Sequence, residues 1–175
     1  LCKELLKFIV DSLELRDKIT VGDKQQIDIT NFKAVTLSDL FKETFGTKTD
    51  ILKIVSTGKL KEFAEEIKSE FKKDETDKKI FDHIFEEFIQ PKLIDPTFVL
   101  DYPIVFSPLA KSKEGGDVAE RFELFIAGEE IANAYSELND PEEQRRRFLI
   151  AKDEIHPMDE NFITASAGIF LFRKG

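Results

Sequence analysis

Several features that fix the location or redox chemistry of a protein are missing from this sequence or nearly so. Its 175 residues include a single cysteine, one methionine and no tryptophan. One cysteine cannot form an intramolecular disulfide, and Cys2 carries no catalytic triad signature, so we expect a structural thiol. There is no signal peptide and no apolar run of about 18 residues, the length that crosses a membrane. A cytoplasmic location is therefore expected.

Positive charge and histidine are also scarce. The chain has 26 Lys and Arg against 35 Asp and Glu, which gives a formal net charge of -9. Phosphate binding needs a clustered excess of basic side chains, so the composition argues against a surface built mainly to hold DNA or other nucleic acid. The run Arg145–Arg147 is expected to be a solvated helix face. His83 and His156 have no partner at metal-ligand spacing and are interpreted as ordinary histidines.

Apolar residues, by contrast, are plentiful. Hydrophobic residues make up 41% of the chain, including 17 Phe, which is enough for a substantial core in one domain or a domain with a lobe. The first segment carries the stripe of an amphipathic helix, formed by Leu1, Leu5, Leu6, Ile9 and Leu13. Something outside this stripe must cover it. Because the chain opens on Leu1 with a helix already in mid-course, we expect a fragment of a longer protein.

Residues 19–35 alternate briefly between apolar and polar, which suits an edge strand or hairpin. A helical lobe is predicted next, over residues 36–90. Thr36 and Asp39 form a capped helix start that Gly46 stops. Two further helices are predicted over 59–73 and 77–90 from the helical spacing of their Ile and Phe residues.

Strands are predicted after Pro91, within residues 91–140. The segments are 96–103, 104–109, 121–127 and 130–138, the last two joined by a turn at Gly128. Their short connections favour antiparallel pairing. Asp140 and Pro141 then begin a helix that should run to about Ile155.

Two blocks within these strands carry a family resemblance. They are RFELFIAGEEIANAYSELND at Arg121–Asp140 and FVLDYPIVFSPLAK at Phe98–Lys111. They resemble lysyl-tRNA synthetases, class II enzymes of the Asp/Lys/Asn subgroup, and the likeness covers nearly the whole chain. The aspartyl and asparaginyl relatives have Gly-Gly and then Arg in the part of the block where this chain has Asn133 to Glu137. The resemblance implies an α+β fold, an antiparallel sheet of the class II aminoacyl-tRNA synthetase type with a helical insertion lobe.

The resemblance also implies the site. Asn133, Tyr135 and Glu137 would bind lysine, with Glu137 as the counter-charge for its ammonium group. Glu123 and Glu130 would hold Mg2+ bridging the phosphates of ATP. The family makes an aminoacyl-adenylate and then charged tRNA(Lys), as a homodimer. If tRNA is a partner, most of its binding surface must lie outside this acidic chain.

These five residues cannot line one site in a regular hairpin. With a turn at Gly128, Glu123 and Glu130 share one face of the hairpin, and Asn133, Tyr135 and Glu137 point to the other. A bulge or twist between Glu130 and Asn133 is therefore predicted if all five act together. The plain alternative is that the two glutamates form a solvated face and Tyr135 is core.

The chain departs from the family at its end. After Ala165 it reads SAGIFLFRKG, where the family has a Gly-x-Gly-x-Asp-Arg motif, and the arginine-bearing loop that reads ATP would precede Leu1. Losing several such charges should abolish activity, so the isolated chain is expected to be inactive. Two other functions stay open: a non-catalytic amino-acid or protein binding module derived from a synthetase, or a ligase that modifies a translation factor.

Overall fold

The structure of the chain is a computed structural model, which describes residues 1–14, 18–22, 25–114 and 116–150. Across these residues no helix has both the length and the apolar character needed to span a bilayer.

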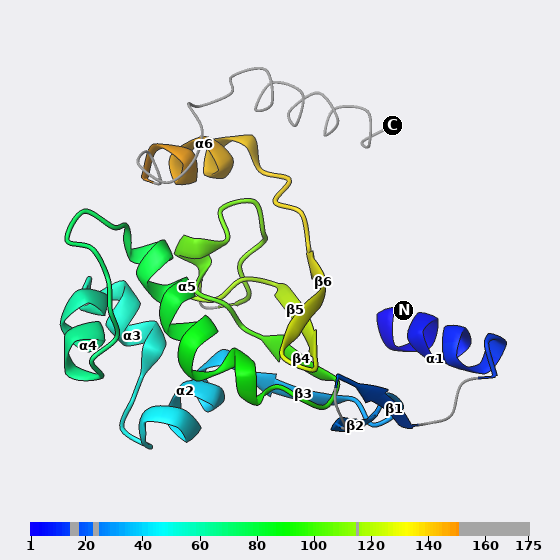
Figure 1. Ribbon diagram of the computed structural model, residues 1–175. Coiled ribbons are helices and arrows are strands. Elements are labelled where there is room, and N and C mark those ends of the chain that lie inside the picture. Colours follow the sequence, from blue (N-terminus) through cyan, green and yellow to red (C-terminus); the bar gives the residue numbers. More distant parts are fainter. Residues whose placement is uncertain (15–17, 23–24, 115, 151–175) are drawn as a thin grey trace, which may run out of the picture.

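A central sheet has the strand order β3-β4-β5-β6. Its strands are β3 (Lys33–Thr36), β4 (Thr97–Leu100), β5 (Arg121–Ile126) and β6 (Glu129–Tyr135). β4, β5 and β6 pair antiparallel, as predicted. β3 instead runs parallel to β4, which requires a crossover connection. The helices between β3 and β4 provide it (Figure 1).

This crossover is built from short helices: α2 (Leu37–Phe45), α3 (Ile51–Ser56), α4 (Leu60–Glu66), α5 (Asp77–Phe88) and the 3-10 turn η1 (Gln90–Lys92). The side chain of Thr36 accepts a hydrogen bond from the Asp39 backbone at 3.1 Å, which confirms the predicted cap of α2. Thr76 caps α5 in the same way through the Lys79 backbone, at 3.4 Å.

The helix predicted over residues 59–73 is too long. α4 ends at Glu66, and Lys68 has a φ of 58°, a left-handed conformation that a right-handed helix cannot contain. Ile67 and Phe71 still pack against the core from beyond the helix. Periodicity therefore identified the apolar face correctly but not the helix end.

Phenylalanine rings join the lobe to the sheet. Phe81 of α5 lies 5.8 Å from Phe41 of α2 and 5.1 Å from Phe106, measured between ring centroids. Phe85 lies 5.4 Å from Phe125 of β5. All five rings are buried, and each such pair contributes about 0.5–1.5 kcal/mol beyond its area burial. The predicted core role of the helical phenylalanines is confirmed.

The strand predicted over residues 104–109 is wrong. Ile104–Phe106 forms a 3-10 turn, η2, after Pro103. The Ile104 backbone N–H donates to the Asp117 carbonyl at 3.0 Å, so the segment bonds to a neighbouring loop and not to a strand. Local β-propensity was overridden by this tertiary contact.

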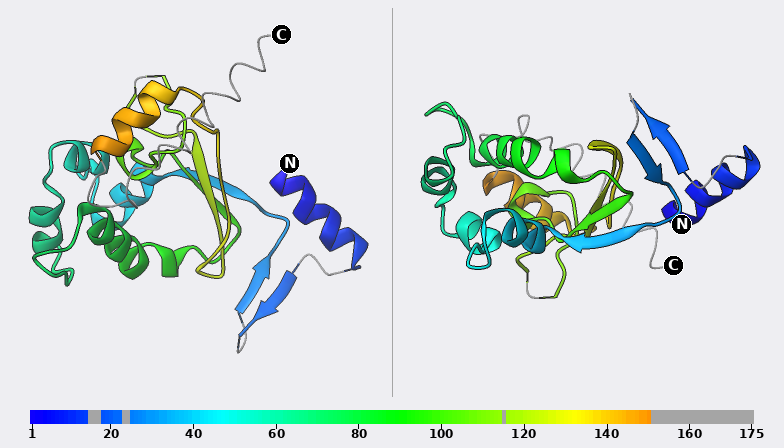
Figure 2. Two further views of the ribbon diagram at one scale, coloured as in Figure 1. Left: turned by 90° about the horizontal axis from the view of Figure 1, so that it is seen from above. Right: turned by 60° about the horizontal axis from the view of Figure 1, so that its bottom comes forward.

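The N-terminal elements lie apart from the lobe, on the other side of the sheet (Figure 2). α1 (Cys2–Ser12) and the hairpin of β1 (Lys18–Val21) with β2 (Gln25–Asp28) confirm the predicted helix and hairpin. Val10 of α1 packs with Ile27 and Ile29. The other side of α1 is open to solvent, with Leu1 98% and Phe8 67% exposed.

α6 (Pro141–Ile150) follows the sheet. The Asp140 carboxylate accepts from the backbone N–H groups of Glu142 and Glu143 at 3.0 and 3.1 Å, which confirms the predicted cap. The predicted continuation to Ile155 lies outside the described residues.

Candidate active site

The site is set up by the hairpin of β5 and β6. Ala127 and Gly128 form its two-residue turn with φ values of 58° and 79°, the left-handed pair of a type I′ turn. Glu123 lies opposite Asn133, while Phe125 lies opposite Glu130. The register shift between these pairs leaves Ile131 unpaired, as a β-bulge. This is the bulge predicted between Glu130 and Asn133, and it turns their side chains to the same face.

Glu123, Glu130 and Asn133 form a polar cluster on this face. The Asn133 amide nitrogen donates to Oε1 of Glu123 at 3.1 Å and to Oε1 of Glu130 at 3.2 Å. Two carboxylates thus lie on either side of one amide. Their negative charges point toward a common space, which is an arrangement suited to a cation.

Three residues that were not predicted complete the cluster. Arg121 pairs with Oε1 of Glu123, and its other nitrogens donate to Ser107 Oγ at 3.0 Å and to Asn133 Oδ1 at 3.2 Å. The Tyr102 hydroxyl donates to Oε2 of Glu123 at 2.5 Å. Arg121 also lies over the Tyr102 ring, 4.8 Å from its centroid. The spacing of Arg121 and Glu123, two residues apart on one strand, was the available signal for the first of these.

Glu123 is the buried one of the two glutamates, at 7% exposure. Burial raises the pKa of its carboxyl above the usual range, and the neighbouring Arg121 charge opposes that shift. Burial and the Glu123 charge also raise the pKa of Tyr102, so its hydroxyl keeps its proton and acts as a donor. Glu130, in contrast, is exposed.

Two hollows border the cluster. One, of about 220 Å³, lies between α5 and the sheet and is lined by Tyr102, Glu123, Glu130 and residues of α5. The second, of about 520 Å³, is lined by Ser107, Leu109, Tyr135 and Phe148. Arg121 and Asn133 line both. The cluster therefore separates a carboxylate-rich space from a more apolar one that has an aromatic wall.

Comparison with known proteins decides the family. The description "tRNA synthetases class II (D, K and N)" matches residues 1–168. The chain belongs to this synthetase family. It is 44% identical over 152 residues to the lysine-tRNA ligase of Clostridium acetobutylicum, which covers 80% of this chain and 29% of that protein.

Two further lysine-tRNA ligases match over more of the chain. Identity is 39% to that of Clostridium kluyveri and 38% to that of Aliarcobacter butzleri. Each match covers 94% of this chain and 35% or 34% of the relative, respectively. The chain thus spans about a third of the length of these synthetases.

The other two predicted site residues, Tyr135 and Glu137, lie at the edge of the cluster or beyond it. Tyr135 is 39% exposed and faces the larger hollow. Glu137 is exposed beyond the end of β6, where its backbone pairs with Ala110. Its carboxylate forms no ion pair within the described residues. The structure brings Glu123, Glu130 and Asn133 together but leaves Glu137 apart from them.

The carboxylate oxygens of Glu123 and Glu130 suit a metal ion that binds together with a nucleotide. Within the described residues no group of three or more His, Cys, Asp or Glu could hold a metal ion alone. Magnesium in ATP-dependent enzymes commonly takes only one or two carboxylates and completes its shell with phosphate oxygens and water. Glu123 and Glu130 fit that requirement.

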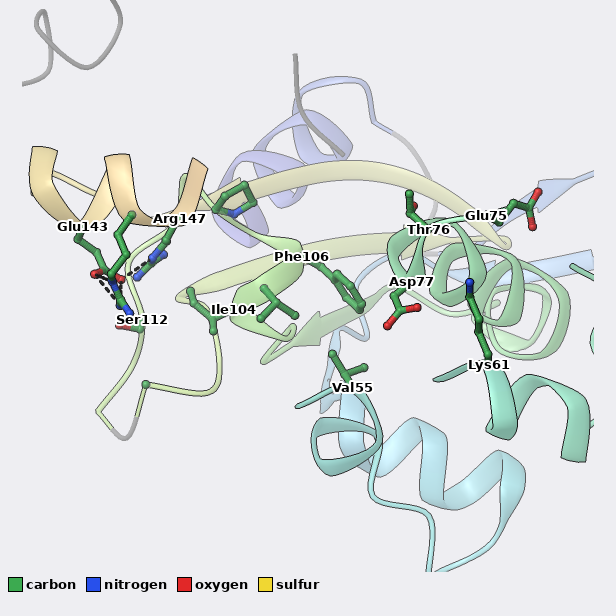
Figure 3. Close-up of a pocket in the computed structure, with 14 residues that line it drawn as sticks. Val55, Lys61, Glu75, Thr76, Asp77, Ile104, Phe106, Ser112, Glu143 and Arg147 are labelled. Atoms are coloured by element: carbon green, nitrogen blue, oxygen red, sulfur yellow. Dashed lines mark hydrogen bonds and ion pairs between the residues drawn. The ribbon is translucent and has the colours of Figure 1, made fainter. Parts of the chain in front are cut away.

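Another hollow of the described residues lies elsewhere, with a volume of about 610 Å³. Figure 3 shows Glu143, Arg147 and Ser112 toward one end and Lys61 and Asp77 toward the other.

Two arginines of the basic run, Arg146 and Arg147, border this hollow, but neither is free to bind phosphate. Arg146 and Arg147 both pair with Glu143, at 2.7 and 2.8 Å. These bonds lower the pKa of Glu143. Arg147, with a side chain only 11% exposed, also bonds the Ala110 carbonyl. The prediction of a solvated face therefore fits Arg146 but is wrong for Arg147, which ties α6 to the loop before β5.

Proposed function

We propose that this chain supplies the lysine- and magnesium-binding part of a lysine-tRNA ligase, an ATP-dependent aminoacyl-tRNA synthetase. The observation that carries the proposal is the bulge at Ile131, which aligns Glu123, Glu130 and Asn133 on one face of the hairpin. The family is described for three amino acids. Relatives named lysine-tRNA ligase over 80–94% of the chain favour lysine among them.

Lysine recognition is assigned to Asn133, Tyr135 and Glu137. The Tyr135 ring offers an apolar wall for the methylene stem of the amino acid and a face for its cation. Glu137 offers an exposed carboxylate to the ammonium group. Asn133 lies between this pocket and the glutamates, and its amide can bind a polar group of the substrate.

Glu123 and Glu130 are the proposed holders of Mg2+ with ATP. Magnesium bound there would offset the charge of the phosphates. The hairpin residues themselves bind and orient the two substrates, so that the lysine carboxylate can attack the α-phosphorus with pyrophosphate as the leaving group. The product is lysyl-adenylate, from which the lysyl group passes to tRNA(Lys).

The chain covers only about a third of the length of these relatives. We therefore propose that the isolated chain is inactive, and that tRNA(Lys) binding and homodimer formation belong to the complete protein. The cytoplasmic location remains a prediction.

The test is lysine-dependent exchange of pyrophosphate into ATP by the complete gene product. We expect exchange with lysine, none with aspartate or asparagine, and none from the isolated chain. Glu137→Gln should lower kcat/KM for lysine about 10- to 100-fold, because a hydrogen bond to a charged group contributes about 1.5–3 kcal/mol. Glu129→Gln, at an exposed glutamate that begins β6, is the matched control and should exchange normally.

Three results would contradict the proposal. Exchange that depends on aspartate or asparagine would show that lysine is not the substrate. Exchange by the isolated chain would contradict the proposal that this chain alone is inactive. The absence of exchange by the complete protein would favour a non-catalytic binding module.

A further inference from the structure

Both carboxylate oxygens of Glu123 are held by donors. The Tyr102 hydroxyl donates to Oε2 at 2.5 Å, while Arg121 and Asn133 both donate to Oε1. A carboxylate has about four lone-pair positions, so three donors leave about one open. The direction of that open position is fixed as long as the donors stay in place.

Tyr102 is suited to this task and to little else in the site. Its side chain is buried, at 3% exposure, and its carbonyl accepts from the Ala119 backbone at 2.8 Å. The ring is covered by Arg121. Tyr102 lines the smaller hollow and not the one that Tyr135 borders. A hydroxyl anchored in this way sets the rotamer of Glu123 without meeting the amino acid.

Arg121 contacts Asn133 as well as Glu123. Its Nε donates to Oδ1 of Asn133 at 3.2 Å, so the amide nitrogen of Asn133 faces Glu123 and Glu130. A third bond, to Ser107, holds the guanidinium plane. A planar fork can make these bonds in three directions at once, which the ammonium group of a lysine cannot reproduce.

We propose that Tyr102 and Arg121 are positioning residues of the synthetase site: Tyr102 orients Glu123 for the metal, and Arg121 orients both Glu123 and the amide of Asn133. This inference rests on the proposed function, because it takes Glu123 as a metal ligand and Asn133 as part of the lysine pocket. Its distinctive consequence is that one guanidinium links the two subsites, whereas the Tyr102 hydroxyl serves only one.

The two variants should therefore give different patterns. Tyr102→Phe removes only the hydroxyl, and the ring that Arg121 covers remains. It should weaken metal binding about 10- to 100-fold, as is usual when the hydrogen-bond partner of a metal ligand is lost, with the KM for lysine unchanged. Arg121→Lys keeps the charge but loses the fork. It should weaken metal binding and raise the KM for lysine together.

A matched control is available on β4. Thr97 is buried and its hydroxyl donates to the Asp95 carbonyl at 2.8 Å, away from the site. Thr97→Val deletes a buried hydroxyl without touching the cluster, so both quantities should stay as in the parent. Ser107→Ala is a milder second variant for Arg121, because it removes one acceptor and no charge. It should move both quantities in the same direction as Arg121→Lys, but by less.

The experiment measures Mn2+ binding by electron paramagnetic resonance, in the presence of a non-hydrolysable ATP analogue, on the complete gene product and each variant. The KM for lysine comes from pyrophosphate exchange at saturating Mg2+. Unchanged Mn2+ affinity in Tyr102→Phe would overturn the proposal. It would also be overturned if the parent did not bind Mn2+, or if Thr97→Val lost as much Mn2+ affinity as Tyr102→Phe.

The same data separate this proposal from the proposed function. If the parent exchanges with lysine but Tyr102→Phe binds Mn2+ like the parent, only the positioning role fails. If Mn2+ binding separates the variants as expected but no exchange depends on lysine, the lysine function fails and the metal-positioning role of Tyr102 stands.

Discussion

Asn133 lies directly across the hairpin from Glu123, and its amide nitrogen is 3.1 Å from Oε1 of that glutamate. The same nitrogen is 3.2 Å from Glu130. One neutral side chain thus bridges two carboxylates.

Replacing this bridge should change stability in a pH-dependent manner. Asn133→Ala removes the donor and should lower the free energy of unfolding by about 1 kcal/mol. Asn133→Asp places a third carboxylate beside two others and should cost more than the alanine at neutral pH. Urea unfolding at neutral and mildly acidic pH measures both.

The difference between Asp and Ala should shrink on acidification, because protonation removes the repulsion. A gap that stays constant with pH would contradict the electrostatic explanation. Asn31→Ala, at an exposed asparagine of another turn, is the control and should be near neutral.

The turn of the hairpin offers a pair of opposite changes. Gly128 has a φ of 79°, and Gly128→Ala should cost about 1–2 kcal/mol. A Cβ there would meet Gln90 O at 3.6 Å, which is ordinary contact, so the cost is conformational. Ala127→Asn should stabilise by about 0.5 kcal/mol, because Asn-Gly is the preferred pair of a type I′ turn. The midpoint of urea unfolding should fall in Gly128→Ala and rise in Ala127→Asn. Shifts of the same sign in both variants would contradict the type I′ turn.

Glu130 allows metal binding to be separated from folding. It is exposed and its carboxylate bonds Asn133, so Glu130→Gln should alter the free energy of unfolding by no more than about 0.5 kcal/mol. We expect it nevertheless to weaken metal binding about tenfold or more, since a carboxylate ligand is lost.

Thermal unfolding of the complete protein with ATP and Mg2+ tests this. ATP and Mg2+ should raise the Tm of the parent, and EDTA should remove this increase. In Glu130→Gln the increase should be small. Glu129→Gln is the control. An equal increase in Glu130→Gln and the parent would exclude Glu130 as a ligand.

Glu143 should give stability that acid removes. Hydrogen bonds from Arg147 and then Arg146 lower its pKa below the ordinary value of 4.5. Because the pKa in the folded state is the lower one, the contribution is complete above the unfolded-state value and is lost as pH falls through the folded-state value. Parent and Glu143→Gln should therefore differ in Tm at neutral pH and converge in acid. A pH-independent difference would show that packing, not charge, is responsible.

The local elements of this fold could be read from the sequence because local chemistry determines them. Thr36, Thr76 and Asp140 cap helices as expected, and Gly128 forms its turn. Even the bulge could be anticipated, since residues expected in one site otherwise lie on opposite faces. Its place at Ile131 follows from cross-strand register, which single-strand periodicity does not contain.

What could not be read depends on contacts distant in sequence. Tyr102 and Ser107 reach the site from loops, so no periodicity connects them with Glu123. Ile104–Phe106 has the composition of a strand, yet its backbone bonds the Asp117 loop. Arg121 was within reach, because residues two apart on a strand share a face.

The parallel pairing of β3 with β4 has a consequence for how the chain folds. Lys33 and Thr97 are register partners although 64 positions apart, and closing so long a loop from an unfolded chain carries a large entropic cost. The intervening helices make mostly local contacts and can form early, which brings the two strand ends together before they pair. Folding of the sheet should thus wait for the lobe: core substitutions such as Phe81→Ala, made far from β3, should slow refolding and not only speed unfolding.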